Sequence, residues 1–202
     1  MSHKQPHNRR AMADNRGATL PLAVLGGLVL GGMVFFLFHF LVMDGPTNTL
    51  EFCISCHEME GVYKEYSESI HYKNHSGVRV VCADCHVPHG KGLVDYLEKL
   101  EDKVLVGGRH LYHHLIGTYP DSASFERERY RLAQYVLGKM KERDSRECRR
   151  CHTFEAMQLA DQSRSAANKH GRLMKQGDGT CIDCHSGVVH EEPKKPGEEQ
   201  PK

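Results

Sequence analysis

The sequence contains no tryptophan, only 39% hydrophobic residues, and 27 basic against 26 acidic residues in 202 positions. Because apolar side chains are scarce, a large core cannot come from side chains alone. The formal net charge of +1 gives no reason to expect nucleic acid or strongly acidic partners. No cysteine is left over for a disulfide, because all eight belong to one repeated motif. At this length, one or two small domains are expected.

The repeated motif is Cys-x-x-Cys-His, which occurs as Cys53/Cys56/His57, Cys82/Cys85/His86, Cys148/Cys151/His152 and Cys181/Cys184/His185. This is the attachment signature of c-type haem, in which the two thiols add to the haem vinyl groups and the histidine binds the iron. Cys-x-x-Cys units can also bind zinc or act as redox pairs. However, zinc needs no fixed histidine after the second cysteine, and redox pairs need no repetition. We therefore predict four covalently bound c-type haems, which would also supply apolar packing.

Residues 17–43 form an apolar run of 27 residues without Lys, Arg, Asp or Glu. As a helix, this run would be about 40 Å long, enough to cross a bilayer core of about 30 Å. A core helix is disfavoured by the polar remainder, and a cleaved signal peptide by the lack of a small-x-small site before Asp44. We predict a single uncleaved anchor in a bacterial inner membrane. The basic residues 1–16 would stay in the cytoplasm and residues 44–202 would face the periplasm.

Two features of this anchor, a histidine and a group of glycines, are only weak indications of function. His39 lies within the span, near its outer end, where a snorkelling side chain is favoured over a functional one. Four glycines, two of which are four residues apart, could form a small-residue face that packs against a second membrane helix, which makes a homodimer possible; they are Gly26, Gly27, Gly31 and Gly32.

The rest of the chain is predicted to be mainly α-helical with much irregular structure. The periplasmic haem domain should span residues 44–190. Within it we expect a short helix over 63–72, an extended segment over 77–81 and a helical linker over 90–147. In the linker, apolar spacing predicts an amphipathic helix broken at Gly107-Gly108, then a turn with a helix start at 119–122 and a helix over 125–143. The Pro- and charge-rich tail, residues 191–202, is expected to be disordered.

Residues 148–190 repeat the plan of residues 53–89, which indicates two dihaem units. Each unit has a motif, a lone histidine, a second motif separated from that histidine by ten residues, and a closing histidine. A second imidazole keeps haem iron six-coordinate, which favours electron transfer over substrate binding. The lone and closing histidines match the number of iron ligands needed; they are His71, His89, His170 and His190. Four other histidines have no repeat partner and are expected at the surface or near haem propionates; they are His75, His110, His113 and His114.

The sequence resembles the NapC/NirT family of membrane-anchored tetrahaem cytochromes, over nearly its whole length. The matching features are the anchor, EFCISCHEM at 51–59, SGVRVVCADCHVPH at 76–89, KERDSRECRRCH at 141–152 and TCIDCHSGVVH at 180–190. The histidine pair at 86–89 is most similar to the NapC branch. The resemblance implies oxidation of a membrane quinol, either menaquinol or ubiquinol. It also implies delivery of electrons to a periplasmic reductase, typically nitrate reductase with its dihaem subunit.

The resemblance also implies particular site residues. In a related protein, the methionine of a CxxCHxM motif binds the first haem iron, so Met59 competes with His57 here. By similarity in position, Lys99 is expected to contact a quinone oxygen and Asp102 to accept a proton, on a segment that also carries Lys103. A thioether ligand would raise the haem potential.

The resulting hypothesis is a quinol dehydrogenase-type electron-transfer protein without terminal reductase activity. The acceptor could also be a nitrite reductase or another periplasmic reductase. One alternative is a multihaem reductase of a small nitrogen or sulfur oxide, which would need a five-coordinate haem with an open face. Another is a zinc-binding structural or assembly factor without haem.

Overall fold

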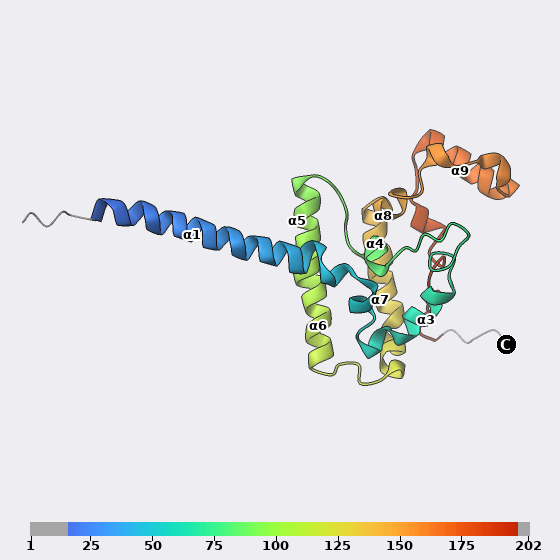
Figure 1. Ribbon diagram of the computed structural model, residues 1–202. Helices are drawn as coiled ribbons and strands as arrows, with labels where there is room; N and C mark the ends of the chain where they lie inside the picture. Colours follow the sequence, from blue (N-terminus) through green and yellow to red (C-terminus); the bar gives the residue numbers. More distant parts are fainter. Residues whose placement is uncertain (1–15, 198–202) are drawn as a thin grey trace, which may run out of the picture.

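The computed structural model describes residues 16–197, and within this range the chain forms helices and irregular segments without a β-strand. The mainly α-helical prediction is confirmed. The long helix α1 (Arg16–Phe38) projects away from a body of shorter helices (Figure 1). The cytoplasmic segment expected at residues 1–16 lies almost wholly outside the described residues.

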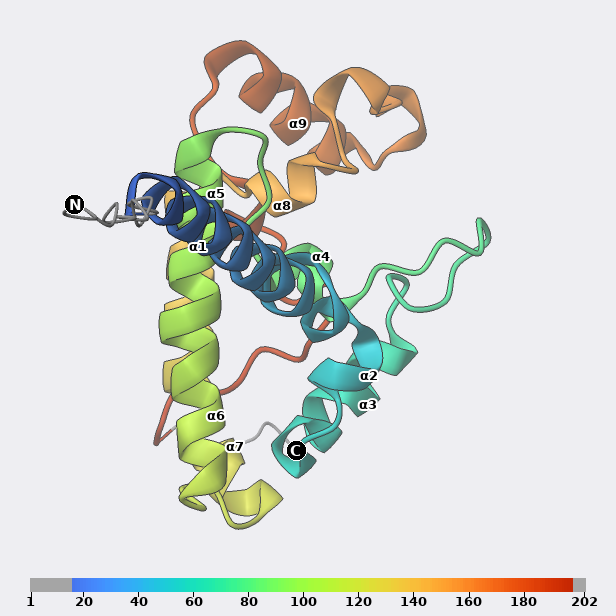
Figure 2. The same ribbon diagram turned by 60° about the vertical axis from the view of Figure 1, so that its left-hand side comes forward.

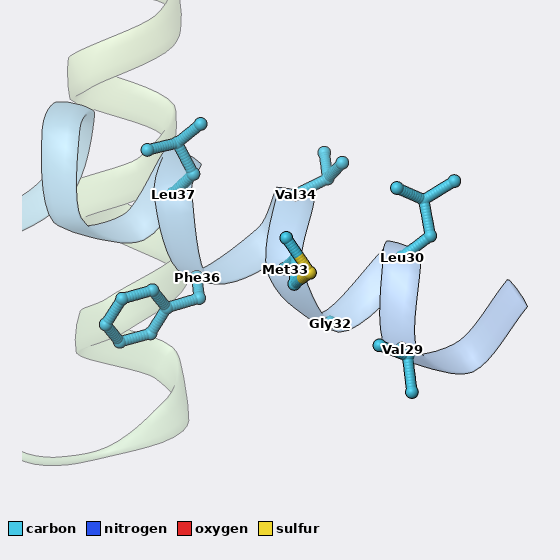
Figure 3. Close-up of a pocket in the computed structure, with 7 residues that line it drawn as sticks. All are labelled: Val29, Leu30, Gly32, Met33, Val34, Phe36 and Leu37. Carbon is cyan, nitrogen blue, oxygen red and sulfur yellow. The ribbon is translucent and has the colours of Figure 1, made fainter. Parts of the chain in front are cut away.

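The apolar helix α1 continues into a π-helical turn, His39–Asp44. Among the described residues, the stretch long and apolar enough to cross a membrane is Leu20–Asn48. An 18-residue part of it has a mean hydropathy of 2.3 and is wholly exposed in the structure. A hollow on its surface is lined by α1 side chains alone, among them Val29, Met33 and Phe36 (Figure 3). A surface of this kind suits lipid contact better than a ligand site. A side chain at any of the four α1 glycines would have open space around it, so the homodimer stays a prediction.

The linker helix differs from the prediction. Helix α5 (Leu93–Glu101), a π-helical segment (Asp102–Gly107) and α6 (Gly108–Leu115) follow one another with helical backbone throughout. The expected break at Gly107-Gly108 is therefore wrong. The chain passes these glycines with helical backbone, and the π-helical segment before them has wider turns than an α-helix. Figures 1 and 2 show α5 and α6 as one rod that passes the end of α1.

Helix α7 (Ser122–Glu142) runs alongside this rod in both views (Figures 1 and 2). It begins where the turn at residues 119–122 predicted. The Asp121 carboxylate accepts a hydrogen bond of 2.7 Å from the backbone N–H of Ser124, which caps the helix start. The next helix, α8 (Arg146–Arg149), follows within a few residues and brings the chain to Cys148.

The remaining helices are short and frame the motifs: α2 (Leu50–Cys53), α3 (Glu60–Glu68), α4 (Cys82–His86) and α9 (Arg164–Gln176). Helix α3 begins and ends a few residues before the predicted range 63–72. Residues 77–81 form an irregular segment in which Gly77 has a φ of +70° and Val81 is extended. Helix α9 was not predicted. Its first turn is capped by the Ser163 hydroxyl, and it ends at Gly177, whose φ of +68° favours glycine.

The protein core is small, as the composition suggested. The buried hydrophobic side chains among residues 20–197 are Met43, Leu50, Tyr66 and Ala83. Hydrogen bonds and ion pairs therefore provide much of the contact between the elements. The backbone of Glu191 donates to Glu65 (3.1 Å) and accepts from Arg129 (3.2 Å), which fixes the point where the predicted disordered tail begins. The last five residues of that tail lie outside the described range.

Candidate haem sites

The four Cys-x-x-Cys-His motifs lie on short helical turns. In the third and fourth motifs, the backbone N–H of the second cysteine donates to the carbonyl of the first at 3.2 Å. The second motif is helix α4 itself, and α2 ends on the first cysteine of the first motif. Residues three apart on a helical turn share a face, so both sulfurs point to the same side. All eight cysteines are free thiols, so both sulfurs of each pair can bond to haem.

The cysteines differ in how far the protein encloses them. Six are half-buried, whereas Cys151 and Cys184, the second cysteines of the third and fourth motifs, are exposed. Cys151 is exposed because α8 ends at Arg149, and the chain beyond it forms a turn at the surface. The protein alone therefore does not form an enclosed site at Cys151, in contrast to its half-buried motif partner Cys148. A thioether bond requires only that haem can reach the sulfur, so attachment at Cys151 stays a prediction from the motif.

Three motif histidines each face a histidine from another segment. The distances between ring centres are 6.2 Å for His71–His152, 6.3 Å for His86–His190 and 6.1 Å for His170–His185. Two imidazoles on opposite sides of one metal, with metal–nitrogen bonds of about 2 Å, place their ring centres about 6 Å apart. The side chains present therefore fit haem irons with two axial imidazoles.

The histidines from outside the motifs that face these three motif histidines are half-buried. His170 Nδ1 lies 2.7 Å from Gln162 Oε1, which leaves Nε2 for a metal. The Nδ1 atoms of His71 and His190 are buried and have no hydrogen-bond partner. The backbone of Val188 near His71, and of Val62 near His190, raises the imidazole pKa by less than burial lowers it. Burial lowers the pKa of both His71 and His190, so both are neutral at pH 7. Neutral imidazole is the metal-binding form.

These facing pairs link the two repeats. His71 of the first repeat faces His152 of the second, and His190 of the second faces His86 of the first. Only the His170–His185 pair lies within one repeat. The repeat in the sequence predicted how many histidines are needed. It could not predict this exchange, which depends on contacts between residues about eighty or more positions apart.

The first motif is arranged differently from the expectation. His57 faces His114 of α6, with ring centres 5.7 Å apart, although His114 was expected at the surface or near a propionate. The predicted ligand His89 has a buried Nδ1 without a hydrogen-bond partner, and it lies near the charges of Arg150 and Lys99. Met59 is half-buried on the same short turn as His57.

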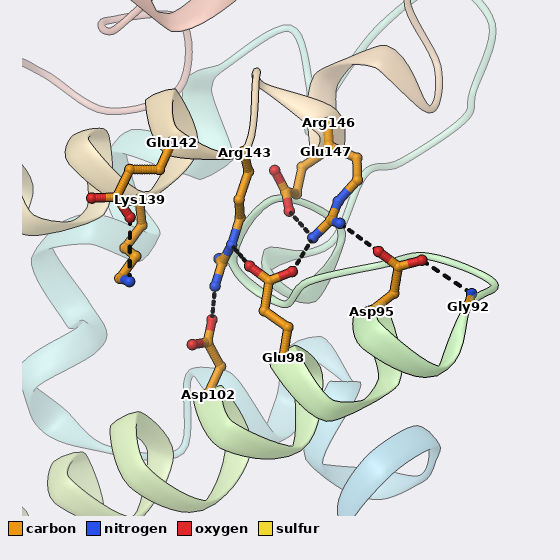
Figure 4. A network of polar contacts seen from close by, with 9 residues as sticks. All are labelled: Gly92, Asp95, Glu98, Asp102, Lys139, Glu142, Arg143, Arg146 and Glu147. Atoms are coloured by element: carbon orange, nitrogen blue, oxygen red, sulfur yellow. Dashed lines mark hydrogen bonds and ion pairs between the residues drawn. The ribbon is translucent and has the colours of Figure 1, made fainter.

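The structure does not bring the two predicted quinol-site residues to one partner. Lys99 forms an ion pair with Asp44 at the end of the π-helical turn that follows α1. The Asp102 carboxylate instead accepts a hydrogen bond of 2.6 Å from Arg143 of the neighbouring loop after α7 (Figure 4). A proton-accepting role for Asp102 would have to compete with this ion pair.

Further polar contacts surround Lys99 where the apolar helix meets the body. Asp44 Oδ2 lies 2.9 Å from His39 Nε2, and the Tyr96 hydroxyl lies 3.4 Å from His39 Nδ1. Lys103 donates to Thr47 Oγ1 at 3.1 Å. Asp44 and Tyr96 were not among the predicted site residues. The signal was available in the spacing of Tyr96, Lys99 and Lys103, which share one face of a helix.

Comparison with known proteins identifies the family of this chain. The model of the NapC/NirT cytochrome c family, N-terminal region, matches residues 14–195. The chain belongs to the NapC/NirT cytochrome c family. The family resemblance inferred from the motifs is thereby confirmed. The NapC/NirT chain is a membrane-anchored tetrahaem c-type cytochrome that carries electrons, and its four cysteine pairs are consistent with four haem sites.

Several curated proteins are similar to this NapC/NirT cytochrome. A "Putative tetraheme cytochrome-c type" protein of Allochromatium vinosum is 46% identical, over 87% of this chain and 91% of that protein. "Cytochrome c-type protein NapC" of Escherichia coli is 44% identical, over 88% and 82%. "Denitrification system component NirT" of Stutzerimonas stutzeri is 40% identical, over 84% and 83%. No solved structure is significantly similar to the chain.

Proposed function

We propose that this cytochrome oxidises quinol at the periplasmic face of a bacterial inner membrane. It then delivers the electrons to a periplasmic reductase, with nitrate reductase or its dihaem cytochrome subunit as the preferred acceptor. The bound haems supply the one-electron redox chemistry. The observation that carries the proposal is the direct contact, through Asp44 and Lys99, between the exposed apolar helix and the haem-binding body. Quinol is confined to the bilayer, so it must be oxidised where these two parts meet.

The choice of acceptor rests on similarity alone. Identity to NapC of Escherichia coli (44%) exceeds identity to NirT (40%) only slightly. Nitrate reductase is therefore the first acceptor to test, and nitrite reductase or another periplasmic reductase is the alternative.

The facing imidazoles support electron transfer in preference to catalysis at a haem. We propose that three haem irons each have two axial histidines, paired as His86 with His190, His152 with His71, and His185 with His170. An iron with two imidazole ligands has no open position for a small oxide. This is an argument against the multihaem reductase.

Lys99 is proposed to contact a quinone oxygen, because its ammonium lies beside the end of α1 and only 14% of its side chain is exposed. Quinol oxidation releases two protons, so a proton acceptor must lie close to the bound quinol. The family resemblance suggested Asp102. The carboxylate beside Lys99 is Asp44, and it contacts His39 in turn, so the role of Asp102 has to be tested against that of Asp44.

The test uses the full-length protein in membranes or liposomes, with reduction of its haems by menaquinol and ubiquinol analogues followed by absorbance. Lys99→Met should lower the initial reduction rate at least tenfold, while haem content and reduction by dithionite stay unchanged. Comparing Asp44→Asn with Asp102→Asn then identifies the proton acceptor as the carboxylate whose loss slows reduction. Purified nitrate and nitrite reductases, added separately, identify the acceptor. A wild-type protein that no quinol reduces would refute the function itself.

A further inference from the structure

The first motif has an imidazole partner that the repeat does not provide. His57 and His114 have ring centres 5.7 Å apart, close to the 6.1–6.3 Å of the three other facing pairs. The rings are inclined at 48°, within the 29–79° found for those pairs. Each motif histidine therefore faces one histidine from outside the motifs, and His114 completes the set for the first motif.

The ring of His114 contacts the buried carboxylate of Glu58, which also lies beside His57, with 3.6 Å between Glu58 Oε1 and His57 Nε2. Glu58 is only 8% exposed, and its two oxygens lie 3.0 and 3.1 Å from His114 Nδ1. An ionised carboxylate can only accept, so Nδ1 carries the proton and Nε2 keeps its lone pair for a metal. Metal-binding histidines commonly donate their second N–H to a carboxylate, which fixes the ring and makes it a stronger ligand. Gln162 holds His170 in a comparable way at 2.7 Å.

We propose that His114 is the second axial ligand of the first haem iron and that Glu58 is its positioning residue. The proposal rests on haem attachment at the first motif and is independent of whether quinol is the electron donor. It makes the first haem a two-histidine haem, and it leaves neither Met59 nor His89 as its ligand.

The neighbouring histidine of α6 provides a matched control. His113 has Nδ1 2.9 Å from the Thr118 hydroxyl, and this contact is exposed to solvent. His113→Leu therefore removes an imidazole from the same helix, one residue away, without touching the pair at the first motif.

The test measures spin state and ligand binding in the purified full-length protein with four haems attached. In His114→Leu, electron paramagnetic resonance should show one of four ferric haems converted to high spin. The reduced protein should bind about one additional carbon monoxide per chain. His113→Leu should match the wild type. If His114→Leu keeps the wild-type spin states, the proposal is wrong. Conversion of one haem by Met59→Leu or His89→Leu alone would overturn it in favour of that residue.

Two further variants decide the matter if His114→Leu loses a haem or fails to fold. His114→Met keeps a ligand of similar reach and should introduce methionine–iron absorption in one haem. Glu58→Gln weakens the acceptor behind His114, so the potential of one haem should rise while all haems stay low-spin. If Glu58→Gln changes neither the potential nor the spin state of any haem, Glu58 is not the positioning residue of an iron ligand. Methionine–iron absorption already present in the wild type would also refute the proposal.

Discussion

Glu98→Ala is expected to loosen the contact between the α5–α6 rod and the α7–α8 junction. Glu98 lies between two arginines, accepting from Arg143 Nε at 2.5 Å and Arg146 Nη2 at 2.7 Å (Figure 4). Each arginine also holds a second carboxylate of the linker helix: Arg143 donates to Asp102 and Arg146 to Asp95, both at 2.6 Å. Glu98 is thus the residue that joins the two ion pairs into one network.

The size of the effect follows from exposure. The side chain of Arg143 is 10% exposed, whereas Glu98 and Arg146 are about one-third exposed. Fully exposed ion pairs contribute about 0–1 kcal/mol, and hydrogen bonds to charged groups about 1.5–3 kcal/mol. Because each arginine keeps its other carboxylate, the variant leaves no buried charge unpaired. We therefore expect a loss of about 1–2 kcal/mol, which is about 2–8 °C in Tm for a domain of this size.

The loss should depend on pH. Burial alone would raise the pKa of Glu98, but the hydrogen bonds from Arg146 and Arg143 outweigh it and hold that pKa below the usual 4.5. A carboxyl with a lowered folded-state pKa stabilises the fold fully above its unfolded pKa, and this contribution disappears as pH falls through the folded value. The difference in Tm between wild type and Glu98→Ala should therefore be full at pH 7 and shrink below about pH 4.5.

The assay is thermal unfolding of the haem-loaded protein in detergent, followed by circular dichroism at one scan rate and at several pH values. Glu142→Ala is the control, because its ion pair with Lys139 is exposed and spans one helical turn at 3.3 Å. That pair should contribute only about 0.3–0.5 kcal/mol. If Glu98→Ala lowers Tm no more than the control, or by the same amount at every pH, the reasoning about the network is wrong.

Three further outcomes are expected. Tyr66→Phe should destabilise the fold by about 1 kcal/mol, because the buried hydroxyl donates to the Val80 carbonyl at 2.6 Å; chemical denaturation measures the loss. Gly177→Ala should cost about 1 kcal/mol in the same assay, because a φ of +68° strains any residue with a side chain, and a change within error would contradict this. Cys181→Ala combined with Cys184→Ala should lower the covalent haem count from four to three by intact mass, and four haems retained would refute attachment there.

The features that the sequence predicted well depend on residues close together in the chain. The motifs, the apolar run and the turn before α7 each lie within a few tens of positions, and the structure has helical turns, α1 and the Asp121 cap at these places. Helix α9 was missed although its signals were also local. Ser163 at its start and Gly177 at its end are a typical pair of helix-capping residues.

The features that could not be predicted depend on long-range contacts. No local pattern shows that His71 faces His152 or that Asp102 pairs with Arg143, since each pair joins different elements. The number of iron ligands that the repeat predicted stays a prediction, and the repeat gave no reason to consider His114 beside the first motif. His114 has no counterpart in the second repeat, so an argument from repetition could not select it.

The continuous rod of α5, the π-helical segment and α6 contacts both the end of α1 and the first motif. The α5 half of the rod binds the end of α1 through Lys99 and Asp44, and the α6 half presents His114 to Glu58 and His57. Between them, the π-helical segment turns more residues per turn than an α-helix and so rotates the α6 face relative to the α5 face. The two contacts can therefore point in different directions on one rod. The rod therefore connects the end of α1 with the first motif, which is where the proposed quinol oxidation would deliver its electrons.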